Sequence, residues 1–158
     1  GIPEFMREQA IRAADIITPN HFELEVLSGM ACPTIDAVRP ALAAVHGLGP
    51  RVILLTSMLT QETPADAIDM LASDGQGAWR VRTPRLGISV NGAGDAVAAL
   101  FMVHWMRTRS AAEALGLASS SIYGLLRRTA EAGSREILTV AAQDEFVTPS
   151  RRFSPEPL

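Results

Sequence analysis

The sequence contains no lysine, and all 14 of its basic residues are arginine. This absence excludes a P-loop, whose Gly-x-x-x-x-Gly-Lys motif needs a lysine to reach the phosphates. It excludes any other mechanism that needs a lysine from this chain. The formal net charge is −3, and the arginines form no clustered basic stripe. We therefore do not expect nucleic acid to be a partner.

Cysteine and long apolar runs are also scarce. The single cysteine, Cys32, cannot form an internal disulfide and fits a reducing compartment. No apolar run approaches the roughly 20 residues needed to cross a bilayer, and no signal-peptide pattern opens the chain. We expect a cytoplasmic protein with no membrane partner. With 158 residues, 47% hydrophobic and 20% charged, the chain suits one globular domain.

Residues 1–5, ahead of Met6, read as a vector-derived scar, so the fold is expected within residues 6–158. Hydrophobic spacing, caps and turn residues predict the regular elements of that region. We expect helices over residues 6–15, 22–27, 34–46, 94–107 and 110–132, and strands over residues 16–18, 52–55, 67–72, 78–81 and 137–140. The proline-rich end from Pro149 is expected to be loosely held.

Strands that alternate with helices predict an α/β sandwich with a mostly parallel sheet and one antiparallel hairpin over residues 67–81. In such folds ligands collect beyond the carboxyl ends of the strands. Three polar segments fall at such ends: Thr18 to Glu23, Thr56-Ser57, and Gly92 to Asp95. Their coincidence is the first functional signal in the sequence.

The segment Gly92-Ala93-Gly94-Asp95 opens a predicted helix. Small residues there let backbone N–H groups converge, and the helix dipole favours an anion such as a transferring phosphoryl group. A carboxylate at the same helix start could take a proton from an attacking hydroxyl. Alternatively, Asp95 only caps the helix and the glycines only form a turn. The tetrapeptide alone leaves both interpretations open.

Asn20 and Glu23 directly follow a predicted strand and could face bound phosphates through Mg²⁺ and its waters. Thr56 and Ser57 could donate hydroxyl groups to a triphosphate. Each pair also has a simpler interpretation: Asn20 turns the chain, Glu23 favours a helix start, and hydroxyl residues after a strand are common. The three histidines, His21, His46 and His104, lack metal-ligand spacing and are expected to be ordinary surface or packing residues.

Taken together, the run from Ile16 to Gly29 (IITPNHFELEVLSG) and the later Gly92-Ala93-Gly94-Asp95 resemble the ribokinase-like superfamily, and within it the pyridoxal kinases. The resemblance implies a three-layer αβα fold. It also implies transfer of the ATP γ-phosphoryl group to the 5′-hydroxymethyl group of pyridoxal or another B6 vitamer. Here Ser89-Val90-Asn91 precedes the Gly-Ala-Gly-Asp, where much of the superfamily has Asp-Thr, which weakens a sugar-kinase interpretation.

The resemblance also implies roles for particular residues. Asp95 matches the general base, and Glu23, with Asn20, matches the Mg²⁺ and phosphate motif. The anion hole matches Gly92, Ala93 and Gly94. The positions that line the ATP phosphates or cover the nucleotide match Thr18, Thr56, Ser57, Thr83, Pro84, Arg85 and Leu86.

A complete member of the family is roughly twice as long, so the resemblance implies that an N-terminal portion carrying most of the vitamin pocket and the dimer-forming elements is missing. We therefore expect a homo-oligomeric family, and poor turnover by this chain alone. Two alternatives stay open: another ribokinase-like kinase, acting on hydroxymethylpyrimidine or a sugar, and a nucleotide-binding module without turnover.

Overall fold

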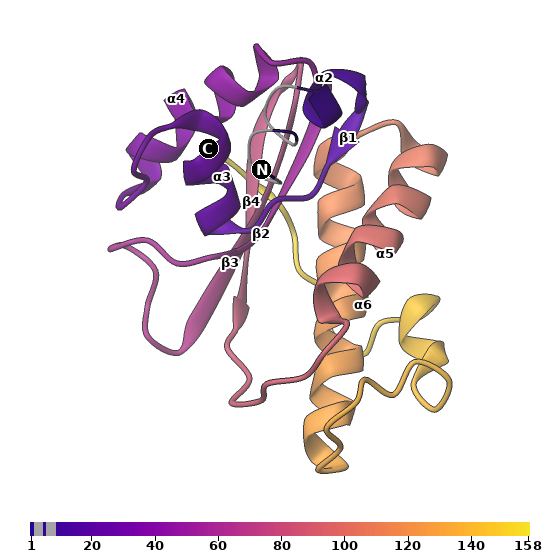
Figure 1. The fold of residues 1–158 in the computed structure, drawn as a ribbon. Coiled ribbons are helices and arrows are strands. Elements are labelled where there is room, and N and C mark those ends of the chain that lie inside the picture. Colours follow the sequence, from indigo (N-terminus) through magenta and orange to yellow (C-terminus); the bar gives the residue numbers. More distant parts are fainter. Residues whose placement is uncertain (2–4, 6–8) are drawn as a thin grey trace.

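The computed structural model describes residues 1, 5 and 9–158 (Figure 1). A five-stranded sheet, in the order β1-β2-β3-β4-β5, lies between two layers of helices. The strands are β1 (Ile16–Ile17), β2 (Val52–Met58), β3 (Ala67–Asp74), β4 (Gly77–Pro84) and β5 (Glu156–Pro157). The helices are α2 (Ile11–Ala13), α3 (His21–Ser28), α4 (Ile35–His46), α5 (Ala93–Thr108), α6 (Ala111–Glu131) and the 3-10 helix η2 (Gln143–Phe146).

Strand β2 is buried on both faces, as its continuous apolar sequence predicts. Successive side chains of a strand point to opposite faces of the sheet. Accordingly, Val52 and Leu54 join the core under α5 and α6, whereas Ile53 and Leu55 join the core under α3 and α4. The predicted three-layer αβα sandwich is confirmed. In the part of the chain that the structure describes, no helix is long and apolar enough to cross a membrane.

The expectation of a mostly parallel sheet is wrong for this chain. Only β1 and β2 pair in parallel; β2–β3, β3–β4 and β4–β5 pair antiparallel. The connection between β2 and β3, residues 59–66, is too short for the crossover that parallel neighbours require. The hairpin of β3 and β4 is confirmed, and its turn is tighter than predicted because the ladder extends to Asp74 opposite Gly77.

Helix ends are where the local sequence signals predict them. Thr34 accepts a hydrogen bond from the Ala37 N–H (3.3 Å) and begins α4. Gly29 ends α3 in the left-handed conformation, with φ 71°. The described part of the first predicted helix contains α2, whereas residues 6–8 and most of the expected scar (residues 2–4) lie outside the described residues.

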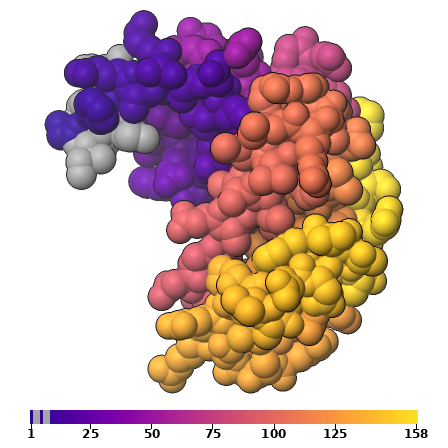
Figure 2. Space-filling view, turned by 90° about the vertical axis from the view of Figure 1, so that its right-hand side faces the viewer, coloured from indigo at the N-terminus to yellow at the C-terminus, as the bar shows by residue number. Residues whose placement is uncertain are grey.

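The C-terminal segment differs from both predictions made for it. Residues 137–140 form no strand: the chain turns at Thr139, and Val140 is 79% exposed. The Pro149 end is not loosely held. The Phe153 N–H donates to Ser120 Oγ (3.0 Å), and β5 pairs with β4. Figure 2 shows this yellow segment lying over the orange helix α6.

We predict that Gly124→Ala lowers the free energy of unfolding by about 1–3 kcal/mol, as overpacking does. Gly124 lies on α6 against the buried carboxylate of Glu145, which accepts the Ser150 N–H (2.7 Å). A methyl group at position 124 overlaps that carboxylate. Urea denaturation measures the effect. Gly75→Ala, in open space at the hairpin turn, is the control and should change little. Equal effects of the two substitutions would contradict the prediction.

Candidate active site

The first turn of α5 has backbone N–H groups that no side chain caps. Gly92 begins the helix in the left-handed conformation, with φ 84°, and no side chain caps the turn. A Cβ atom built on Gly94 meets no other atom within 4 Å, so this backbone faces open space. Asp95 lies in the same turn and is exposed rather than packed into the interior. Uncapped N–H groups at a helix start, with the helix dipole behind them, favour an anion.

The end of β2 has an unusual backbone. The pairing of β2 with β3 shifts between Leu55 and Met58. Within this irregularity Ser57 adopts φ 51°; among the described residues only Arg109 is a second non-glycine with positive φ. Such a conformation costs about 1–3 kcal/mol and is retained where surrounding contacts enforce it, often at functional sites. No signal in the sequence indicates it.

A cavity of about 100 Å³ joins this strand end to the start of α5. Thr56, Ser57 and Thr83 line it together with Ala93 and Gly94. Two of the three polar segments at predicted strand ends, Thr56-Ser57 and Gly92 to Asp95, therefore meet in one place, together with Thr83. The apolar remainder of the lining was not predicted, because it comes from strand and helix interiors that carry no motif: Ile68, Met70, Val97, Ile122, Tyr123 and Leu126.

The segment expected to cover the nucleotide only partly faces this cavity. Thr83 is buried in β4 and lines the cavity. Pro84, Arg85 and Leu86 are not among the lining residues, and the Arg85 N–H donates to the Asp66 carbonyl (2.7 Å).

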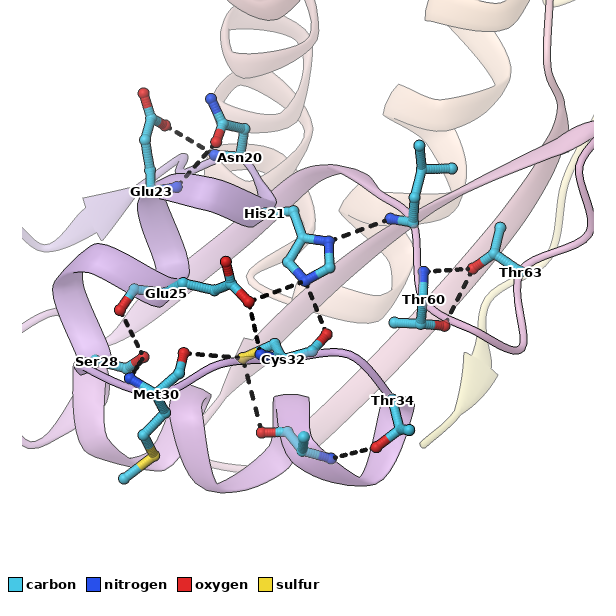
Figure 3. Close-up of polar contacts among 12 residues, drawn as sticks. Asn20, His21, Glu23, Glu25, Ser28, Met30, Cys32, Thr34, Thr60 and Thr63 are labelled. Atoms are coloured by element: carbon cyan, nitrogen blue, oxygen red, sulfur yellow. Dashed lines mark hydrogen bonds and ion pairs between the residues drawn. The ribbon is translucent and has the colours of Figure 1, made fainter.

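Asn20 and Glu23 form a reciprocal capping box at the start of α3 (Figure 3). Asn20 Oδ1 accepts the Glu23 N–H (2.9 Å), and Glu23 Oε2 accepts the Asn20 N–H (2.8 Å). The simpler interpretation, in which Asn20 turns the chain and Glu23 favours the helix start, is thus confirmed. The box also holds the exposed Glu23 side chain in one orientation, so a structural role and a ligand role are compatible.

The capping box adjoins the strand end. Asn20 forms a parallel bridge with Thr56, whose N–H donates to the Pro19 carbonyl (2.8 Å). Thr18 and Glu23 line a second, larger hollow of about 680 Å³ along β1 and α3. The structure therefore places the predicted residues in a row, from Thr18 and Glu23 through Thr56 and Ser57 to the first turn of α5. Figure 2 shows the surface hollowed between the indigo N-terminal elements and the pink segment before α5.

The described residues include no group of three or more histidine, cysteine, aspartate or glutamate side chains able to hold a metal ion. Glu23 is a single carboxylate with one oxygen engaged by the cap. This set fits Mg²⁺ only where phosphate and water complete the coordination, which is the usual arrangement for Mg²⁺ with nucleotides. It does not fit a metal held by protein side chains alone.

Cys32 lies behind α3, outside the cavity. Its side chain is fully buried, and burial, followed by the nearby Glu25 carboxylate, raises the pKa of its thiol. Because the reactive form of cysteine is the thiolate, this environment makes Cys32 unreactive.

Comparison with known proteins agrees with this fold. The family model described as phosphomethylpyrimidine kinase matches residues 2–140. The chain therefore belongs to the phosphomethylpyrimidine kinase family.

Similar curated proteins include several pyridoxal kinases. Pyridoxal kinase PdxY of Granulibacter bethesdensis is 51% identical over 157 residues, which cover 97% of this chain and 55% of the relative. That of Rubrobacter xylanophilus is 49% identical, with 97% and 53% covered. The chain thus spans about half the length of the curated relatives it matches.

Solved structures share the fold. A putative phosphomethylpyrimidine kinase of Bacteroides thetaiotaomicron aligns with a TM-score of 0.88 at 25% identity, covering 99% of this chain and 56% of that one. Pyridoxal kinase of Leishmania donovani in complex with ADP and ginkgotoxin aligns with a TM-score of 0.86 at 25% identity, covering 99% and 55%. The resemblance to the ribokinase-like fold and to the pyridoxal kinases is confirmed.

The backbone of Ser57 gives a direct test of the strand-end geometry. We predict that the free energy of unfolding of Ser57→Val is about 1–2 kcal/mol lower than that of Ser57→Gly. Glycine tolerates the left-handed conformation, and a β-branched residue does not. Urea denaturation of the two variants measures the difference. The control is Ser154, which is exposed and precedes Pro155. A residue before proline favours extended backbone, which suits valine, so Ser154→Val should be more stable than Ser154→Gly. A more stable valine variant at position 57 would contradict the geometry.

Proposed function

We propose that this chain supplies the nucleotide-binding part of a kinase that transfers the γ-phosphoryl group of ATP to the 5′-hydroxymethyl group of pyridoxal or another B6 vitamer. One observation carries the proposal: a single cavity joins the hydroxyl-lined end of β2 to the uncapped, glycine-rich start of α5, where Asp95 is exposed. The curated relatives named pyridoxal kinase, and the similar structure that contains ADP, support it.

In this proposal the chain contributes positioning and charge neutralisation, on which phosphoryl transfer mostly depends. The N–H groups of Gly92, Ala93 and Gly94 donate to the oxygens of the transferring group. Asp95 accepts the proton of the attacking hydroxyl as the new O–P bond forms and the bond to the ADP oxygen breaks. The hydroxyl groups of Thr18, Thr56 and Ser57, along the same row, hold the other phosphates, and Thr83 belongs to the segment that covers the nucleotide.

Glu23, oriented by Asn20, would hold Mg²⁺ together with the phosphates, and the ion would offset their charge. The segment from Pro84 to Leu86 would cover the nucleotide from the end of β4. Both assignments follow from the family motif, and the capping box supports the first because it fixes the carboxylate.

The acceptor pocket and the oligomer contacts are proposed to lie in the portion of the relatives that this chain does not span. Two exposed features support a covering partner in the active assembly. Strand β1 lies at the edge of the sheet, and on α5 the apolar side chains of Met102, Val103 and Met106 are 53%, 50% and 54% exposed. Contiguous exposed apolar side chains commonly mark interaction surfaces.

A second candidate is phosphorylation of a hydroxymethylpyrimidine. The family description and the Bacteroides structure, both named phosphomethylpyrimidine kinase, favour a pyrimidine acceptor. A panel of pyridoxal, pyridoxine, hydroxymethylpyrimidine and a sugar, each with ATP and Mg²⁺, separates the acceptors. The chain would be assayed alone and fused to the remaining segment of the Granulibacter relative. Nucleotide affinity without transfer in the fusion would favour a non-catalytic binding module.

Asp95→Asn is predicted to lower phosphoryl transfer by the fusion about 100- to 10,000-fold, the contribution of a general base. The Kd for ADP, measured by calorimetry, should not rise, because the backbone N–H groups of the exposed first turn remain and the substitution removes a negative charge beside the phosphates. Asp144→Asn, on η2 and outside the cavity, is the control and should keep full activity. A fully active Asp95→Asn variant would eliminate this residue as the base.

Two substitutions of Glu23 separate its capping role from its charge. Glutamine preserves the capping box, so Glu23→Gln should keep wild-type stability, whereas Glu23→Ala should lose about 1 kcal/mol. Both remove the carboxylate and should weaken Mg²⁺-dependent ADP binding about tenfold, with little effect on binding in EDTA. Calorimetry with and without Mg²⁺ measures this. If Glu23→Gln binds Mg²⁺ and ADP as the wild type does, Glu23 has only a capping role.

A further inference from the structure

The imidazole ring of His21 connects the start of α3 to the loop that follows β2 (Figure 3). Its Nδ1 lies 3.4 Å from the backbone nitrogen of Leu59, and its Nε2 lies 2.9 Å from the carbonyl oxygen of Cys32. A backbone N–H can only donate and a carbonyl can only accept. These partners fit the tautomer with a proton on Nε2, so that Nδ1 accepts from Leu59 and Nε2 donates to Cys32, with Glu25 Oε1 4.0 Å from the same nitrogen.

The contact with Leu59 lies two residues from Ser57, the strained residue that lines the cavity. Ser57, with its left-handed backbone, stands between Thr56 and Leu59, where the pairing of β2 with β3 is interrupted. On one side, the Thr56 N–H donates to the Pro19 carbonyl (2.8 Å). On the other side, the Leu59 N–H donates to His21. Both acceptors belong to the same short turn, so the strained residue is held between two links to residues 19–21.

The loop has other attachments, so the role of His21 is local. The Gln61 N–H donates to the Pro33 carbonyl (2.9 Å), and the Thr60 N–H donates to Thr63 Oγ1 (3.0 Å). Losing the ring should therefore free the backbone near Ser57 without detaching the whole loop or unfolding the chain.

We propose that His21 is a positioning residue of the nucleotide site, an inference that rests on the proposed function. Its side chain lines neither the cavity nor the larger hollow along β1 and α3. Through Leu59 it keeps Ser57 in the conformation that lines the cavity shared with Ala93 and Gly94. It also keeps that strand end at a fixed distance from the neighbouring Asn20 and Glu23, so two parts of the site move as one unit.

His46 provides a matched comparison, because its ring makes two hydrogen bonds of the same kind elsewhere in the fold. Its Nδ1 lies 2.8 Å from the Pro50 carbonyl, and its Nε2 lies 2.8 Å from Ser73 Oγ. Neither His46 nor these partners line the cavity. A merely structural histidine should behave like His46.

Three substitutions separate the two contacts of His21. Asparagine can place an acceptor oxygen near Nδ1 and preserve the link to Leu59. Glutamine extends toward Nε2 and preserves the link to Cys32, and alanine removes both. The readouts are the Kd of the whole chain for ADP with Mg²⁺ and the hydrogen exchange of the Leu59 amide. His21→Ala and His21→Gln should weaken ADP about three- to tenfold, the worth of one hydrogen bond, and speed Leu59 exchange.

His21→Asn should restore ADP affinity to within about twofold and restore Leu59 protection, whereas His46→Ala should lower thermal stability with ADP affinity unchanged. Wild-type affinity in the alanine variant, or equal weakening by His46→Ala, would overturn the proposal. If the wild-type chain does not bind ADP, the proposed function itself fails for this chain, and so does a nucleotide role for His21. Leu59 exchange then still shows whether the link exists.

Discussion

The candidate site is built around the first turn of α5, whose backbone N–H groups no side chain caps. In many helices a serine, threonine or aspartate side chain accepts a hydrogen bond from these N–H groups. Here the cap residue is Gly92, which has a left-handed backbone and no side chain to do so. The donors stay available, and the small residues around them leave room for a ligand to approach. A carboxylate in the same turn would be an unfavourable neighbour for an anion unless its proton-accepting ability were needed.

The sandwich keeps this helix start where the strands end. Phe101 is fully buried and Val97 nearly so, and both fix α5 against the sheet face that also carries Val52 and Leu54. The opposite face of β2 packs under α3 and α4, which anchors the Asn20 turn on the same edge. Because both layers pack against one strand, three segments far apart in the sequence meet at its end. The strained Ser57 lies at the centre of this meeting point.

Much of this arrangement could be predicted from local signals. The Asn20 turn, the glycine end of α3, the Thr34 cap and the start of α5 each have a residue whose side chain or lack of one determines the backbone. The features that local signals did not predict correctly depend on contacts with residues remote in sequence. Residues 137–140 have strand-forming side chains, but in the described part of the chain the pairing stops at the preceding residue, where Glu136 bridges Asn91. The proline-rich C-terminal sequence indicates no regular structure, but its residues pair as β5 with the edge of β4. The left-handed Ser57 results from contacts on both sides, which no single residue indicates.

The central claim is that α5 and the end of β2 hold one polyphosphate between them. Titrating isotopically labelled protein with ADP and Mg²⁺, while following backbone amides by NMR, tests it most directly. If both elements contact the same phosphates, the amide signals of Ala93, Gly94 and Ser57 shift together and saturate with one shared Kd. If ADP binds while these three signals stay unchanged, α5 and the end of β2 do not hold the phosphates together. If no amide signal shifts at any ADP concentration, the chain does not bind ADP at all.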